Sequence, residues 1–225
     1  QSSLPKELIV PDNQLVTILS ETIGVSAVAP TRGKRRDILS VALENAKQML
    51  DQHFQTARLE DDNLALLDEL KTKLNLKKTP LDIELYDNSH TAGYDCVGAM
   101  VKYINGEKAK QLYRKYKINQ PNKQDDLASM KEVLTRRFRR LKEGEEKIPD
   151  LIILDGGFNQ CLVGLEVKEE CGIDIPLAGL EKNDKHETDT LINADTGEQI
   201  PLDRKSPLFF LLMRMQDEVH RFAIT

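Results

Sequence analysis

Two aspartates stand at the ends of runs that favour β-strands, and their carboxylates are the first candidates for chemistry. The run LDIELY leads into Asp87, and the continuous apolar run LIIL ends at Asp155, which two glycines follow. If the two strands are parallel neighbours, both carboxylates lie at one edge of a sheet, where a hard divalent cation with oxygen ligands binds well. The alternative is that each aspartate only shapes a turn.

A histidine and an acidic helix start are the next candidates. His220 lies in the segment QDEVHRF, beside an apolar stripe and three residues after Asp217. Such a histidine either binds a metal or forms hydrogen bonds within the core. Asp125 and Asp126 begin a predicted helix. They either take part in the chemistry or serve only as the N-terminal cap of that helix and as a partner of its dipole.

Taken together, these side chains describe one class of reaction. Hydrolysis of a phosphodiester needs positive charge to screen the anionic phosphate. Two Mg²⁺ ions about 4 Å apart provide that charge when carboxylates and an imidazole hold them. The sequence therefore indicates a two-metal phosphodiester hydrolase whose side chains are Asp87, Asp155, His220 and one acid of the helix start.

Basic residues are concentrated in a few short segments. KEVLTRRFRR at 131–140 has five positive charges and one negative charge, and QLYRKYK at 111–117 mixes aromatic and cationic side chains. Surfaces of this kind bind the backbone of a nucleic acid without reading its sequence, although a solvated helix face has a similar composition. The candidates for such contacts are Arg136, Arg137, Arg139, Arg140, Tyr113, Arg114 and Tyr116.

The elements that must position these residues fall into two parts. Residues 1–76 are predicted to form a small α/β segment, which we expect to pack on the rest of the chain. The segment ends before residues 77–80, whose composition breaks a helix. Its predicted elements are strands at 7–10 and 26–30 and helices at 12–23, 34–50 and 63–74.

Residues 77–225 have a mixed order of strands and helices. The predicted elements are strands at 81–86, 96–104 and 109–118, a helix at 125–141, a strand at 151–154, a helix at 159–170, a strand at 175–180, a hairpin flap at 188–202 and a last helix from 206. This order is typical of an RNase-H-like fold, an α/β architecture with a mixed five-stranded sheet flanked by helices.

Composition limits the class of protein less than the motifs do. The chain has 225 residues and a formal net charge of −5, which at first sight argues against binding to nucleic acid. Three cysteines without a CxxC spacing, no long apolar stretch and no signal peptide fit a cytoplasmic protein. Because the sequence starts at Gln1 and stops just after an apolar helical pattern, we expect a domain of a longer chain.

Four motifs resemble those of the UvrC family, the incision subunits of bacterial nucleotide excision repair. In chain order they are YDNSHTAG, DDLASMKEVLTRRF, IPDLIILDGG and DEVHRFAIT. The stretches LPKELIVP and APTRGKRRDILSVALENA also look like the part of UvrC that precedes its second nuclease. The resemblance covers essentially the whole chain.

The resemblance implies an RNase-H-like endonuclease domain that uses Mg²⁺ or Mn²⁺ to cut a damaged DNA strand on the 5′ side of the lesion. By family, the metal ligands are Asp87, Asp155 and His220, and the acidic pair supplies Asp126 as a further catalytic acid.

The resemblance also sets expectations about partners. Full-length family members act on damaged double-stranded DNA together with the UvrB subunit. Their N-terminal nuclease, UvrB-binding segment and tandem helix-hairpin-helix lie outside this sequence, so we expect a monomer with little DNA affinity of its own. Phe158 and Asn159 replace the Lys and Gly usual after the LDGG motif, which removes a cation near the metal site.

Two other functions are compatible with the residues themselves. The first is a module without activity that docks proteins or DNA and uses its acids only as caps. The second is a metal-dependent phosphatase for a small substrate, which would need a motif such as DxD after the first strand. Asp87, Asn88 and Ser89 do not provide that motif.

Overall fold

The chain divides into two compact units, Gln1–Leu59 and Glu60–Thr225. No helix in the described part of the chain is long and apolar enough to cross a membrane. The computed structural model, apart from the side chains of residues 23, 53, 55–58 and 89, describes residues 5–89, 97–118, 125–185 and 187–225. The sequence predicted a division after residue 76, and the packing of the N-terminal segment on the nuclease stays a prediction.

The first unit begins with the two short strands and the helix that the sequence predicted, and the strands pair in parallel. Strand β1 (Glu7–Ile9) pairs with β2 (Ser26–Val28), and helix α1 (Asn13–Ile23) connects them. The side chain of Asp12 accepts a hydrogen bond from the Leu15 backbone at 2.9 Å and so caps α1. Gly24 ends the helix with a φ of 70°, a left-handed conformation that suits glycine.

Helix α2 (Lys34–Lys73) is a single helix of 40 residues, where the sequence predicted two. Residues 51–62, which separate the two predicted helices, contain neither glycine nor proline, so nothing in them ends the helix. In the second unit its end brings Leu67, Leu70 and the adjoining Leu74 into the core, at the spacing of one helical face.

The second unit is built on a mixed sheet, and the predicted RNase-H-like fold class is confirmed. Along the sheet the order is β10-β9-β8-β7-β3-β4-β5, and β6 also pairs with β4. Its strands are β3 (Asp82–Ser89), β4 (Val97–Ile104), β5 (Glu107–Lys108), β6 (Arg114–Lys117), β7 (Leu151–Leu154), β8 (Leu177–Lys182), β9 (Thr188–Asn193) and β10 (Glu198–Pro201).

The described strands of this sheet number eight, whereas the sequence predicted five. The five expected strands form its centre in the order β6-β4-β3-β7-β8, with β3, β7 and β8 parallel to one another. The additional strands are the two-residue β5 and the hairpin β9–β10. That hairpin was predicted as a flap but extends the sheet, because β9 pairs with β8 in antiparallel fashion.

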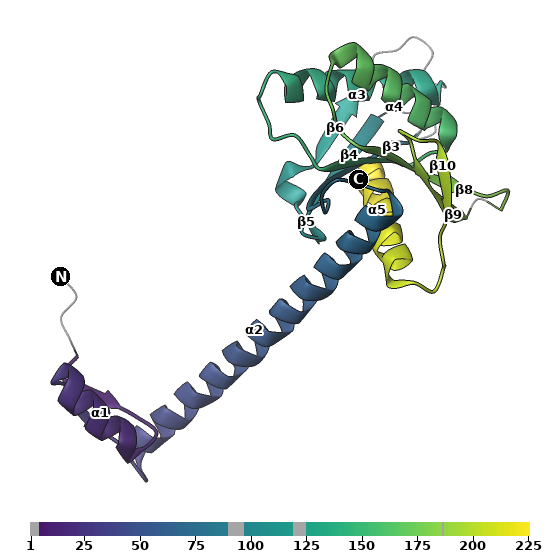
Figure 1. The fold of residues 1–225 in the computed structure, drawn as a ribbon. Coiled ribbons are helices and arrows are strands. Elements are labelled where there is room, and N and C mark those ends of the chain that lie inside the picture. Colours follow the sequence, from purple (N-terminus) through teal and green to yellow (C-terminus); the bar gives the residue numbers. More distant parts are fainter. Residues whose placement is uncertain (1–4, 90–96, 119–124, 186) are drawn as a thin grey trace. The chain divides into compact units, whose positions relative to one another are not determined.

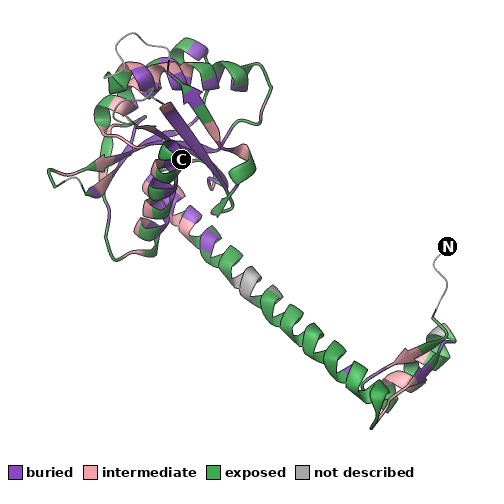
Figure 2. Cartoon of the chain, turned by 180° about the vertical axis from the view of Figure 1, so that it is seen from behind, coloured by how far each residue is buried: buried purple, intermediate pink, exposed green. Residues whose placement is uncertain are grey.

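Helices cover both faces of the sheet in the second unit (Figure 1). Helices α3 (Asp126–Lys142) and α4 (Phe158–Cys171) lie on one face, and α5 (Pro207–Ile224) lies on the other. A single turn of 3₁₀-helix, η1 (Lys110–Leu112), connects β5 to β6. The strands between the helices are buried, as Figure 2 shows.

Strand β3 contributes to the packing on both faces because its side chains alternate. Ile83 and Leu85 lie in the apolar core under α5, and Tyr86 lies in the core under α3 and α4. Since the pattern continues along the strand, the next residue, Asp87, belongs to the face that α5 covers.

Candidate metal centre

The two strand-end aspartates lie side by side at one edge of the sheet. Asp87 is in the last part of β3, and Asp155 directly follows β7. The strands are parallel neighbours with Tyr86 opposite Leu154, and the Asp155 backbone donates a hydrogen bond to the Tyr86 carbonyl at 2.8 Å. The sequence-based expectation that both carboxylates share an edge therefore agrees with the structure.

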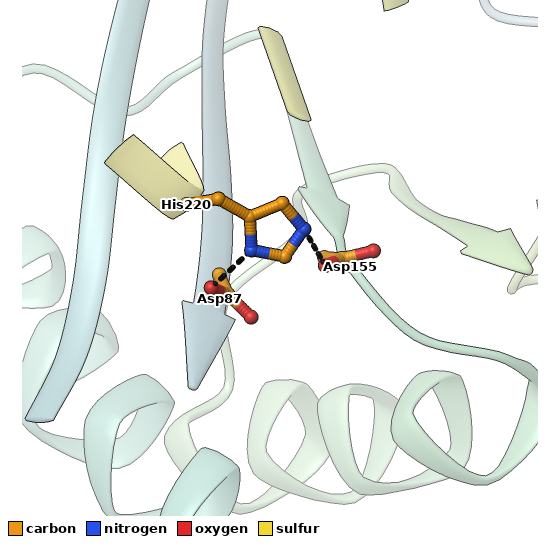
Figure 3. Close-up of side chains that lie close together, drawn as sticks. All are labelled: Asp87, Asp155 and His220. Carbon is orange, nitrogen blue, oxygen red and sulfur yellow. Dashed lines mark hydrogen bonds and ion pairs between the residues drawn. The ribbon is translucent and has the colours of Figure 1, made fainter. Parts of the chain in front are cut away.

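His220 comes to these aspartates from α5 on the face of the sheet (Figure 3). Its Nδ1 lies 2.8 Å from Asp87 Oδ2, and its Nε2 lies 3.0 Å from Asp155 Oδ2. The ring is half-buried, and its partners are these carboxylates, while Asp217 is exposed to solvent. Figure 3 shows the imidazole between the two acids, one in β3 and one directly after β7.

The electrostatics of the three groups are coupled. Carboxylates only accept hydrogen bonds, so a ring that bonds to both of them donates from both nitrogens and is an imidazolium. The hydrogen bonds to Asp155 and Asp87 accordingly raise the pKa of His220 to about 10. Burial by itself raises the pKa of Asp155, but hydrogen bonds from His220 and Gln216 and the charge of Lys182 lower it below the usual value.

The donor set fits a hard divalent cation. Asp87, Asp155 and His220 each offer one ligand atom, and these atoms all lie within 4.8 Å of one another. Ligands of one Mg²⁺ or Mn²⁺ lie about 3–4 Å apart, given bonds of about 2.1 Å, so small side-chain rotations suffice. The imidazole would give up one proton to present a lone pair to the ion.

Asp126 faces the same region from the start of α3. A cavity of about 50 Å³ is lined by Asp87, Asn88, Asp126, Met130, Asp155 and Gln160. Asp125 caps α3, since its Oδ1 accepts a hydrogen bond from the Ala128 backbone at 3.0 Å. The Asn88 side chain donates to the Asp126 carbonyl at 3.1 Å, which ties the helix start to β3. The capping alternative thus holds for Asp125, while Asp126 lies beside the two strand-end acids.

Two contacts of Asp155 were not predicted from the sequence. The Gln216 side chain donates a hydrogen bond to Asp155 Oδ1, and Gln216 in turn accepts one from the Thr188 hydroxyl at 2.9 Å. Lys182, at the end of β8, lies with its Nζ 3.2 Å from Asp155 Oδ2. The available signals were the spacing of Gln216 four residues before His220 and the position of Lys182 at the end of a strand next to β7.

The turn after Asp155 is tightly packed. A Cβ on Gly157 would lie 2.5 Å from Glu181 Oε1, so a larger residue there would displace that side chain. Phe158 then begins α4 as an exposed residue. Phe158 brings no cation to this turn, but the Lys182 ammonium lies beside the site.

Three of the predicted nucleic-acid contacts are corrected by burial. Arg137 has no exposed surface, because its guanidinium forms ion pairs inside the protein with Glu84 and with Glu146. Tyr113 and Tyr116 are also buried, since both rings point into the packed layers around β6.

The other four predicted contacts lie at the surface or close to it. Arg136, Arg139 and Arg140 are exposed on α3, and Arg114 is half-buried. The Arg136 side chain donates to the Lys117 carbonyl at 2.8 Å and lies over the Tyr116 ring at 5.5 Å. Tyr116 therefore supports a cation at the surface and is not itself exposed.

Comparison with known proteins identifies the family. Residues 71–224 match the model of the UvrC RNase H endonuclease domain. Among solved structures, Endonuclease V of Ciona intestinalis in complex with a 24mer DNA containing an inosine is 16% identical, with 66% of this chain and 77% of that chain covered at a TM-score of 0.37.

Two further structures show a similarly distant likeness. The catalytic domain of human Endonuclease V is 16% identical and covers 62% of this chain and 74% of its own, with a TM-score of 0.34. Argonaute of Marinitoga piezophila with a 5′ OH guide RNA is 15% identical over 49% of this chain and 20% of its own, with a TM-score of 0.30.

Proposed function

Because the chain belongs to the family of UvrC RNase H endonuclease domains, we propose that it makes the 5′-side incision in a damaged DNA strand during nucleotide excision repair. The family decides among the three functions that the residues left open, since its members are endonucleases. The observation that carries the proposal is the convergence of Asp87, Asp155 and His220 at one edge of the sheet.

In this proposal the three converging side chains hold a Mg²⁺ or Mn²⁺ ion. For the second ion of a two-metal mechanism, the proposed ligands are Asp87 and Asp126, which line one cavity. Ions bound there supply positive charge that screens the phosphate and favours deprotonation of the attacking water.

The protein's own residues orient these ligands. Gln216 bonds to Oδ1 of Asp155 and so leaves Oδ2 directed at His220 and the ion site.

In the hydrolysis, the oxygen of water joins phosphorus, one bond between phosphorus and a sugar oxygen breaks, and the released oxygen takes up a proton.

The exposed cations of the two basic segments, residues 131–140 on α3 and 111–117 at β6, are the proposed contacts to the DNA backbone. They are Lys115, Lys117, Arg136, Arg139 and Arg140. Contacts of lysine and arginine to phosphates position a strand without reading its bases. In the full-length protein we propose that UvrB and the other domains supply most of the DNA affinity, and that the protein acts in the cytoplasm.

The test is a single isosteric change in the full-length protein. With UvrB and a duplex that contains a lesion, Asp155→Asn is expected to lower the rate of the 5′ cut by at least about 100-fold, because bound metal contributes several kcal/mol to the transition state. The 3′ cut, which the resemblance assigns to the other nuclease, is expected to persist. Gel mapping of both cuts measures the result.

The matched control is Asp184→Asn, which removes an exposed carboxylate on the loop after β8. It is expected to cut like the unaltered protein on both sides of the lesion. If Asp155→Asn still makes the 5′ cut at the normal rate, the proposed mechanism is wrong.

A further inference from the structure

Lys182 is a cation at the metal site to which neither the motifs nor the proposed mechanism gives a role. It is the last residue of β8, which lies beside β7 in the sheet. Its Nζ lies 3.2 Å from Asp155 Oδ2, the oxygen that His220 Nε2 also contacts at 3.0 Å. Among the described residues, it is the one Lys or Arg in ion-pair contact with either strand-end aspartate.

The exposure of the two partners differs greatly. The Lys182 side chain is 39% exposed, whereas that of Asp155 is 3% exposed. A lysine carries its charge on a flexible four-carbon stem with three donors, so this ammonium can turn from the carboxylate toward a ligand that arrives from solvent. Asp155 has no such freedom, because Gln216 holds its other oxygen.

The charges at the site explain when Lys182 becomes available. In the absence of metal, the His220 ring and the ammonium of Lys182 face the two carboxylates of Asp87 and Asp155. A divalent ion brings two positive charges, which balance these two carboxylates without Lys182. The Lys182 ammonium is then a surplus cation beside the place where a phosphate must bind, and charge-assisted hydrogen bonds to phosphate are strong.

We propose that Lys182 is a catalytic residue that donates hydrogen bonds from Nζ to a non-bridging oxygen of the scissile phosphate. This inference rests on the proposed function and names a residue that contacts its substrate.

A lysine with a purely structural role would act only by holding Asp155 in place. The two roles differ in their effect on metal binding. If Lys182 contacts the phosphate, its removal takes away a charge that repels the metal, so the affinity of the protein for the metal stays unchanged or increases. If Lys182 only supports Asp155, its removal lowers that affinity.

The experiment measures metal affinity and incision separately in the full-length protein. Lys182→Met keeps most of the stem and removes the charge, while Lys182→Arg keeps the charge. Calorimetry with Mn²⁺ gives the dissociation constant, and single-turnover incision of a lesion-containing duplex at saturating Mn²⁺ gives the rate. Lys185→Met is the matched control, because Lys185 is an exposed lysine three residues further along the chain, on the loop after β8.

We expect Lys182→Met to bind Mn²⁺ at least as tightly as the unaltered protein and to cut about 100-fold more slowly, the usual loss for one donor to a developing charge. Lys182→Arg is expected to recover at least about tenfold of that rate, and Lys185→Met to match the unaltered protein in both measurements.

Two results would overturn the role of Lys182. One is a weaker Mn²⁺ affinity of Lys182→Met, which would make Lys182 a positioning residue for Asp155. The other is an unchanged incision rate. The proposed function itself would be contradicted by other results. These are an Asp155→Asn variant that still cuts, or an unaltered protein that binds no Mn²⁺. Either result would also contradict the inference about Lys182.

Discussion

The imidazole of His220 is held between two carboxylates, and this arrangement determines how the site responds to pH. As an imidazolium, the ring neutralises one of the two negative charges that Asp87 and Asp155 bring together. As a neutral ring, it offers a metal ligand. The same side chain therefore stabilises the metal-free site and, on losing a proton, becomes part of the metal site.

This arrangement predicts the titration of His220 in the metal-free protein. Its hydrogen bonds raise the pKa from 6.5 to about 10, so the ring is expected to stay protonated at pH 8. Because the pKa of the folded state is the higher one, the stabilisation is complete below pH 6.5 and is lost as the pH rises through about 10. NMR of the ring nitrogens measures the titration.

The His220→Gln variant identifies the His220 signal by its absence. Saturating Mg²⁺ is expected to shift deprotonation of the ring to lower pH, since the ion competes with the proton. A His220 signal that titrates near pH 6.5 in the metal-free protein would contradict the arrangement.

At the scale of the elements, a buried ion pair connects α3 to the central strand. Glu84 lies in β3 without exposed surface and bonds to Arg137 of α3, to Lys102 of β4 and to the Tyr86 hydroxyl. Buried charges of this kind are stable only while each retains its partners. The pair fixes α3, whose first turn carries Asp126, against the strand that carries Asp87.

Breaking that pair is expected to cost stability. Arg137→Met leaves Glu84 as a buried charge with one cation fewer, and the free energy of unfolding is expected to fall by about 3–5 kcal/mol. Arg139→Met, an exposed change two residues away on the same helix, is the control and is expected to stay within about 0.5 kcal/mol. Urea unfolding measures both, and equal effects of the two changes would count against a structural role of the pair.

At the scale of the molecule, the net charge of −5 does not exclude action on DNA. The chain belongs to an endonuclease family, and its charges are unevenly distributed. Exposed cations gather on α3 and β6, while acids gather at the edge of the sheet. The local field at each surface matters for binding, and the sum over the chain does not describe it.

Metal binding is expected to stabilise the folded protein as a whole. At free Mn²⁺ 100-fold above its dissociation constant, linkage predicts about 2.7 kcal/mol of added stability. The melting temperature is therefore expected to rise with Mn²⁺ and to fall back when a chelator is added. Asp87→Asn is expected to abolish the rise and Asp184→Asn to retain it, and a rise that persists in Asp87→Asn would place the metal elsewhere.

Most of the elements along the chain, and the side chains with the strongest chemistry, could be identified from local patterns in the sequence. Strand runs that end in aspartate, and an apolar stripe beside His220, are local patterns, so these residues could be singled out, and their expected convergence agrees with the structure. The prediction of two helices in place of α2 was wrong, although the sequence contained the relevant signal. Residues 51–62 include no helix-breaking glycine or proline, so the helix continues.

The burial of neighbouring residues and the contacts between distant ones depend on the packing of the folded protein. Arg137 and Arg139 look alike in the sequence, yet one is inside and one is outside, because α3 packs a single face on the sheet. Lys182 and Gln216 reach Asp155 from a different strand and from a helix. Contacts between residues far apart in the chain depend on how whole elements pack, and no local pattern encodes that packing.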